Sequence, residues 1–157
     1  ISKYQELSEN FIREFKNKVY WVRISNFQKL SENFIREFKD KINWQAVSYY
    51  QILSQDTIRE FQDKVCWSYI SFRQNLSENF IREFQDKVDW RLISLYKKLS
   101  EPFIIEFNDK FDWGIISRYQ PLSKKFIVEF IDKINIEALL ENKNITNEIK
   151  ETIKILI

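Results

Sequence analysis

The stretch LSENFIREFKDKINW, residues 30–44, decides the fold of this chain, because nearly the same residues occur three times. Close versions are LSENFIREFKNKVYW at residues 7–21 and LSENFIREFQDKVDW at residues 76–90. Less similar versions of the same stretch occupy the positions between and after these three copies. One leucine and one tryptophan therefore recur every 23 residues, at Leu7, Leu30, Leu53, Leu76, Leu99 and Leu122 and at Trp21, Trp44, Trp67, Trp90 and Trp113. A fixed period of this length is typical of stacked repeat proteins.

A single long helix does not fit this period. At 3.6 residues per turn, a helix of 23 residues ends about 140° beyond whole turns. The leucines of successive repeats would then face different directions, and no continuous apolar stripe could form. The chain must therefore turn inside each repeat.

Two helices are predicted in each repeat. Ser8 stands at an N-cap position before ENFIREFKNK, whose apolar residues share one face of an amphipathic helix of about ten residues. Glutamate–lysine pairs four residues apart, such as Glu14 and Lys18, would support this first helix. A shorter second helix begins at the tryptophan, as in WRLISLYK from Trp90. Its N-cap candidates in successive repeats are Asn43, Asp89, Asp112 and Asn135.

A hairpin of this size cannot bury its apolar face alone, so neighbouring hairpins must cover it. We therefore predict an all-α fold, an α-solenoid of about seven stacked helix-turn-helix repeats of 23 residues. Residues 1–134 would form the array of helical hairpin repeats. Residues 135–157 would form a divergent C-terminal capping repeat, in which Ile136 takes the place of tryptophan. Because the chain opens in the middle of a repeat, we expect that Ile1 is not the native start.

The composition supports a helical fold and narrows the function. The 157 residues include one Gly, two Pro and no His, and so few glycines argue against β-sandwiches, barrels and doubly wound folds. The net charge of +2 gives no general attraction to nucleic acid or anionic lipid. Cys66 is the single cysteine, so we expect no internal disulfide and a reducing compartment. No apolar run approaches the roughly 20 residues that span a bilayer, and no signal peptide is recognisable, so no membrane partner is expected.

The repeat unit LSENFIREFKDKINWQAVSYYQ resembles a short repeat of proteins from giant DNA viruses. In those proteins a block close to L-S-E-x-F-I-x-E-F-x-D-K-V-D-W-x-x-I-S-x-Y-Q recurs many times. The resemblance covers residues 1 to about 134, and the departures are Thr57 for Phe, Arg73 for Tyr and Ile136 for Trp. It implies a viral interaction or structural protein without catalytic residues. The corresponding expectation is a cytoplasmic location, in the host cytoplasm or in the virion.

Catalysis is not expected. Without histidine the chain lacks the commonest general base and metal ligand, and it has no glycine-rich phosphate loop. A serine recurs in the second helices but has no evident activating base, so we expect its hydroxyl to bond the carbonyl four residues earlier. These serines are Ser25, Ser48, Ser71, Ser94 and Ser117. We predict that the protein is not an enzyme and has no cofactor, catalytic residue or metal ligand.

Two periodic features could serve nucleic-acid binding. The tryptophans could stack on bases, but aromatic residues at helical spacing favour core packing. An arginine that recurs at Arg13, Arg36, Arg59 and Arg82 could follow phosphates. Carboxylates four residues before it, such as Glu9, and four residues after it, such as Asp40, are expected to neutralise this row. We therefore do not favour nucleic acid as the partner, and a solenoid that reads one nucleotide per repeat stays the alternative.

The second helix carries three positions that change chemistry between repeats and share one helix face. Solenoids present partner-specific side chains on such a face, although a solvated face without a partner would vary in the same way. Clustered aromatic residues favour a contact surface. The candidate partner-binding residues are Arg23, Asn26, Gln45, Tyr49, Tyr69, Phe72, Arg91, Leu95 and Arg118. We predict a non-enzymatic scaffold that binds another protein, with a structural component of a virion as a further alternative.

Overall fold

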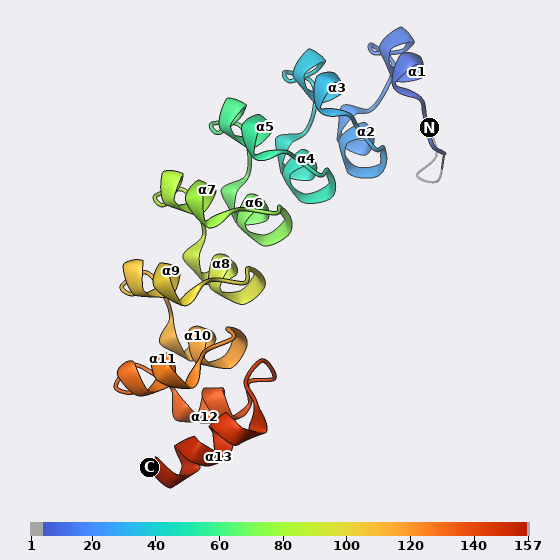
Figure 1. The fold of residues 1–157 in the computed structure, drawn as a ribbon. Coiled ribbons are helices and arrows are strands. Elements are labelled where there is room, and N and C mark those ends of the chain that lie inside the picture. Colours follow the sequence, from blue (N-terminus) through green and yellow to red (C-terminus); the bar gives the residue numbers. More distant parts are fainter. Residues whose placement is uncertain (1–4, 157) are drawn as a thin grey trace. The chain divides into compact units, whose positions relative to one another are not determined.

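Every regular element that the structure describes is a helix (Figure 1). The structure is a computed structural model that describes residues 5–156, with side chains to residue 154. Residues 1–4, the start of the predicted array, and residue 157, the end of the predicted capping repeat, lie outside the described part. The first and second helices each begin every 23 residues, which confirms the all-α repeat fold. They are α1 (Glu9–Glu14), α2 (Trp21–Phe27), α3 (Glu32–Glu37), α4 (Trp44–Tyr50), α5 (Gln55–Glu60), α6 (Trp67–Arg73), α7 (Glu78–Glu83), α8 (Trp90–Tyr96), α9 (Glu101–Glu106), α10 (Trp113–Tyr119), α11 (Lys124–Glu129), α12 (Ile136–Leu140) and α13 (Asn147–Leu156).

The helices form two compact units, residues 1–76 with α1–α6 and residues 77–157 with α7–α13. Within the first unit, α1, α3 and α5 lie in one layer and α2, α4 and α6 in a second layer beside it (Figure 1). In this second layer α2 packs on α4 and α4 on α6, and in the other unit α8 packs on α10 and α10 on α12. Sequential packing of equivalent helices is the arrangement of an α-solenoid. The helices α12 and α13, from the predicted capping repeat, belong to the second unit.

The first helix of each described hairpin is six residues long, so the predicted length of about ten was wrong. It begins as predicted, because the Ser8 hydroxyl accepts a backbone N–H of the first turn, and the equivalent serines do the same. It ends at Glu14 because Phe15 leaves the helical path, with φ −102° and ψ 23°. The carbonyl of Lys16 accepts the indole N–H of Trp21 at 3.1 Å, which holds the start of the second helix against this turn.

Ion pairs and hydrogen bonds link successive first helices. Because each helix ends at its glutamate, the lysine four residues later lies beyond the helix, and the predicted glutamate–lysine pairs do not support it. The glutamate instead binds the arginine of the preceding repeat, as Glu37 does with Arg13 at 2.7 Å. In the same interface, Glu9 Oε1 accepts the backbone N–H of Ser31 at 2.7 Å. Three further glutamates bind the next repeat in this way, namely Glu32, Glu78 and Glu101.

One of these carboxylates has a shifted pKa. Burial acts to raise the pKa of Glu32, but the hydrogen bonds from Ser54 and Thr57 and the charge of Arg36 outweigh it. The pKa therefore lies below its ordinary value of 4.5. The contact between α3 and α5 thus favours the ionised carboxylate.

The second helices are capped as the sequence predicts. Asn43, Asp89, Asp112 and Asn135 each accept a backbone N–H of the first helical turn. The N-cap residues of α2 and α6, Tyr20 and Cys66, make no such side-chain bond. The chemistry of a single residue before the tryptophan therefore determines whether the helix start receives a side-chain cap.

Four tryptophans pack against the repeat that follows them, as expected for core residues, but their indoles stay half-exposed; these are Trp21, Trp44, Trp90 and Trp113. The ring centroid of Trp44 lies 4.7 Å from that of Phe61, and that of Trp90 lies 4.9 Å from that of Phe107. The fully buried core consists of smaller aromatic and aliphatic side chains, among them Phe34, Phe80, Phe103, Ile35, Ile58 and Ile93. The tryptophans therefore cover the edge of this core.

Buried glutamines join successive second helices, a feature that the sequence analysis missed. The last carbonyls of a helix have no partner within it, and this chain, with its one Gly, lacks glycine C-caps. Gln51 Nε2 donates to the carbonyls of Ser25 and Gln28 at 3.2 and 2.9 Å, and Gln51 Oε1 accepts the N–H of Leu30 at 3.0 Å. Equivalent buried amides come from Gln74, Gln120 and Asn142. We call each of these sets of bonds a glutamine rung.

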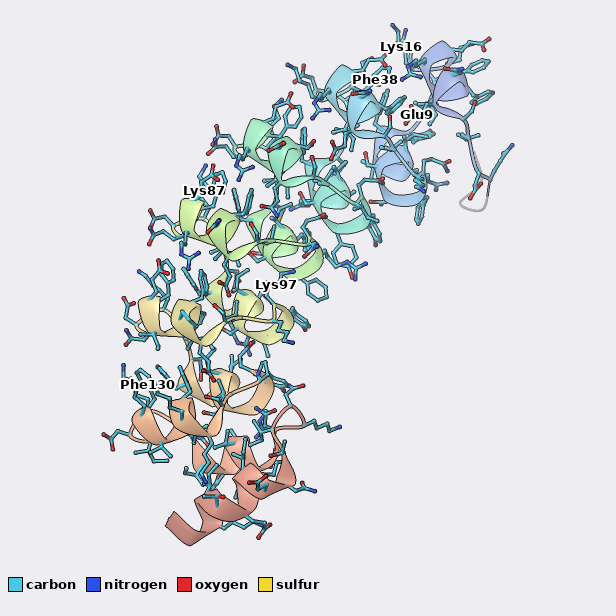
Figure 2. The ribbon with its side chains drawn as sticks, in the orientation of Figure 1. Glu9, Lys16, Phe38, Lys87, Lys97 and Phe130 are labelled. Atoms are coloured by element: carbon cyan, nitrogen blue, oxygen red, sulfur yellow. The ribbon has the colours of Figure 1, made fainter. Side chains whose placement is uncertain are left out.

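Lys97 occupies the glutamine position at the end of α8 (Figure 2). Its side chain is half-buried, and this burial lowers the pKa of its ammonium group below the ordinary value of 10.5. The change from an amide to an ammonium therefore places a cation where the other repeats place a neutral group.

Candidate protein-binding face of the second helices

The second helices are fixed on one side by their serines, which leaves the opposite side as the candidate face. Ser48 is fully buried, and its hydroxyl donates to the carbonyl of Trp44 at 2.7 Å, as the sequence predicts. The same oxygen accepts the backbone N–H of Cys66, at the start of the next second helix, at 2.9 Å. Ser25 and Ser117 make the same two bonds in their repeats. The small polar residue thus joins adjacent second helices at close range.

None of the nine candidate residues, all from the second helices, is buried. Exposed side chains belong to Arg23, Gln45, Tyr69, Arg91 and Arg118, and half-buried ones to Asn26, Tyr49, Phe72 and Leu95. Ala46 stands at one of the three variable positions of α4, beside Gln45 and Tyr49, and it is buried. Its methyl group is too short to reach beyond its neighbours, and it lies among the residues that line a groove.

Aromatic side chains of α4 and α6 form a cluster in the first unit. The ring centroid of Tyr49 lies 4.7 Å from that of Tyr50 and 5.1 Å from that of Tyr69, and both contacts are edge-to-face. Phe72 lies 6.1 Å from Tyr49. The guanidinium of Arg73 covers Tyr49 at 4.9 Å and Phe72 at 5.5 Å, and its Nε donates to the Tyr49 carbonyl at 3.3 Å. These contacts confine the rings and favour a single arrangement.

A groove of about 480 Å³ runs along α2, α4 and α6 beside this cluster, and we call it the tyrosine groove. It brings together four of the predicted residues, Asn26, Gln45, Tyr49 and Tyr69. The remaining lining comes from Val22, Asn43, Ala46 and Tyr50. None of these eight side chains carries a charge at neutral pH. Arg23 and Phe72 are not part of the lining, but the ring of Phe72 contacts the lining residue Tyr49.

The other three candidates meet in a separate groove of the second unit. Arg91, Leu95 and Arg118 line a hollow of about 440 Å³ along α8, α10 and α12. Its character is different, because the lining includes three carboxylates, and Arg118 pairs with one of them, Glu141, at 2.7 Å. Seven of the nine residues therefore line two grooves of unlike chemistry, while Arg23 and Phe72 line neither.

Sequence reasoning missed two residues of the aromatic cluster. Tyr50 does not stand at a variable position, because the equivalent position holds an aromatic residue in most repeats, Phe27, Tyr96 and Tyr119. Arg73 was noted only as a departure from the repeat. The signal for Tyr50 is the pair Tyr49 and Tyr50, which adds a second ring where most other repeats have one. The signal for Arg73 is a cation at a position that is aromatic in most other repeats.

The arginine row of the first helices is engaged in ion pairs. Arg13, Arg36 and Arg82 each contact the glutamate of the next repeat at 2.6–2.8 Å, and the hydrogen bond that Arg13 donates to Glu37 raises the pKa of Arg13. The predicted carboxylates four residues earlier also contact this row, Glu9 with Arg13 at 3.5 Å and Glu32 with Arg36 at 3.8 Å. The predicted carboxylate four residues later does not, since Asp40 contacts Lys64 at 2.7 Å. The hydrogen bond from Lys64 lowers the pKa of Asp40. These arginines thus link repeats to one another.

Within residues 5–156, no group of three or more His, Cys, Asp or Glu side chains is placed to hold a metal ion. Over the same residues, no helix combines the length and the apolar character that a membrane span requires. Comparisons of this chain with protein-family models, with curated proteins and with solved structures found no match. The geometry of the second helices is therefore the basis on which a function has to be argued.

Proposed function

We propose that this chain is a non-enzymatic protein-interaction scaffold that binds a partner protein in the tyrosine groove. One observation carries the proposal: three tyrosines, Tyr49, Tyr50 and Tyr69, line a groove beside the side-chain amides of Asn26 and Gln45. Tyr50 and Tyr69 are 55% and 38% exposed. Exposed, clustered tyrosines dominate the binding energy of many protein interfaces, because each offers a large rigid ring and a polar end.

The frame around the groove suits a scaffold. The glutamine rung of Gln51 and the hydroxyl of Ser48 hold α2, α4 and α6 in register from their buried side. Side chains on the outer side can therefore vary without disturbing the stack. A groove on rigid helices also loses little conformational entropy when a partner binds.

The engagement of the serine hydroxyls supports a non-enzymatic role. In Ser25, Ser48 and Ser117 the oxygen donates one hydrogen bond and accepts another, so it is not free to act as a nucleophile. The chain also contains no histidine that could take the proton. A viral setting, with the partner in the host cytoplasm or the virion, is supported by the repeat motif alone, and a structural role in the virion would use the same groove permanently.

The nucleic-acid alternative has weaker support. A solenoid that follows phosphates needs cations that are free to replace counterions, and the row of Arg13, Arg36 and Arg82 is paired with carboxylates. In addition, no lysine or arginine lines the tyrosine groove. We expect only weak binding to single-stranded DNA or RNA in filter-binding assays at physiological salt. Nanomolar affinity with a sequence preference would favour the alternative instead.

Comparative affinity capture from infected or host cells, followed by mass spectrometry, tests the proposal. The wild type is compared with the double variant Tyr49→Ala/Tyr69→Ala, which removes both groove walls, and with Tyr20→Ala. Tyr20 is the matched control, because it is an exposed tyrosine of the same unit outside the groove. We expect a protein that the wild type and the control retain and the double variant loses. If every captured protein is retained equally by all three, the groove is not the binding site.

A further inference from the structure

The walls of the tyrosine groove are suited to flat, rigid groups. Tyr49 meets Tyr50 at an interplanar angle of 70° and Tyr69 at 78°. In an edge-to-face pair, part of each ring face stays uncovered. Uncovered faces of neighbouring rings can border a shallow slot. The pyrrolidine ring of proline fills slots of this kind in aromatic-lined peptide grooves.

The polar groups of the groove are open to a ligand. In the described part of the chain, the amides of Asn26 and Gln45 and the hydroxyls of Tyr49, Tyr50 and Tyr69 form no hydrogen bond to another protein group. All of them can donate. A polyproline II segment has no internal hydrogen bonds, so its carbonyls are open acceptors along its whole length. A helical peptide, in contrast, uses most of its carbonyls internally.

The charge of the groove argues against other occupants. No acidic side chain lines it, and the guanidinium of Arg73 already covers one side of Tyr49 at 4.9 Å. A cationic ligand, which aromatic cages otherwise bind, would meet this positive charge at close range. An amphipathic helix would need a continuous apolar floor, and here the floor is limited to Val22 and Ala46.

We propose that the tyrosine groove binds a proline-rich segment of the partner in the polyproline II conformation, a proposal that rests on the proposed function and names the ligand of that site. The groove extends over α2, α4 and α6, which are two repeat steps apart. At about 8–10 Å per step this is roughly 16–20 Å. With a rise of 3.1 Å per residue, the bound segment has about five or six residues.

Titration of the full chain with synthetic peptides, followed by backbone amide NMR shifts, tests this inference. The probe is an acetylated and amidated decaproline, and the reference is a Gly-Ser peptide of the same length. We expect saturable binding of decaproline at least about tenfold tighter than that of the reference. The shift changes should concentrate in α2, α4 and α6. Equal binding of the two peptides, or changes centred elsewhere, would overturn the inference.

Variants separate the groove from general surface effects. Tyr49→Ala/Tyr69→Ala should weaken decaproline binding at least about tenfold, whereas the matched control Tyr20→Ala should leave it unchanged. Gln45→Ala changes an exposed side chain that makes no bond in the described residues, so it leaves the fold intact; it should weaken binding severalfold. An unchanged affinity in Gln45→Ala and in the double variant would contradict the proposed mode.

The two proposals fail in different ways. If decaproline does not bind but the captured partner still depends on Tyr49 and Tyr69, the polyproline inference is wrong and the proposed function stands. If neither decaproline nor any captured protein depends on these two residues, both proposals are wrong. Binding of decaproline in the groove, abolished by the double variant, supports both.

Discussion

The glutamine rungs provide the sharpest test of how the repeats are held together. Gln51→Leu keeps the side-chain size nearly constant and removes both polar groups of the amide. The N–H of Leu30 and the carbonyls of Ser25 and Gln28, which the amide contacts at 3.0, 3.2 and 2.9 Å, then lose these hydrogen bonds. All three groups lie in buried residues, so water cannot readily replace the amide.

The magnitude follows from these three groups. A buried polar group without its hydrogen bond costs about 1–3 kcal/mol, so three groups cost at least about 3 kcal/mol. The leucine recovers roughly 1 kcal/mol, because its burial requires no desolvation of an amide. We therefore expect Gln51→Leu to lower the free energy of unfolding by at least about 2 kcal/mol.

Gln45→Leu is the matched control, because it makes the same exchange at an exposed side chain of the same helix. It should change the free energy of unfolding by less than about 0.5 kcal/mol. Urea denaturation followed by far-UV circular dichroism measures both variants, and the midpoints should differ while the slopes stay similar. If Gln51→Leu costs no more than Gln45→Leu, hydrogen bonds between second helices do not hold the stack together.

Three further predictions concern other contacts. Trp90→Ala should lower the free energy of unfolding by about 2–4 kcal/mol in urea denaturation. This is the lower part of the usual range for large aromatic residues, because the indole packs on Phe107 but stays half-exposed. A variant as stable as the wild type would contradict the core role of Trp90. Because the folded pKa of Lys97 lies below 10.5, the unfolded state binds more protons between the two values, and stability should rise with pH in that interval. Lys97→Gln should remove this part of the rise in pH-dependent urea denaturation, and an unaltered slope would refute the assignment. Because the folded pKa of Glu32 lies below 4.5, the stability it contributes is complete above the unfolded pKa and is lost as pH falls through the folded pKa. Glu32→Gln should reduce this acid loss in denaturation series between about pH 5 and pH 2, while Glu14→Gln, whose carboxylate has no partner in the described residues, should not.

Much of the candidate site could be anticipated from the repeat pattern, and some of it could not. The variable positions of the second helix led to Asn26, Gln45, Tyr49 and Tyr69, which the structure gathers in one groove. Their variation between repeats was visible because the frame around them is constant. The burial of Ala46 was not visible, because exposure at a given helix position depends on how far neighbouring side chains reach over it.

The sequence by itself determined the period, the two helices of each repeat and their starts. The reason is that these features depend on residues within one or two helical turns of one another, such as the bond from Ser8 to the first turn of α1 or from Asn43 to that of α4. The need of each small hairpin for neighbours then made stacking the only way to bury the recurring Leu and Phe side chains.

Only the tertiary structure decided where the first helices end, which carboxylate of the next repeat each arginine binds and what caps the C-terminal ends of the second helices. The partners of Gln51 lie 21–26 residues away, and Arg13 binds a glutamate 24 residues away. No local rule selects among residues at such distances, because several carboxylates and amides in each repeat could serve equally well. The packing of one hairpin on the next brings a single one of them within hydrogen-bonding range, and this same packing sets the three tyrosines side by side in the groove.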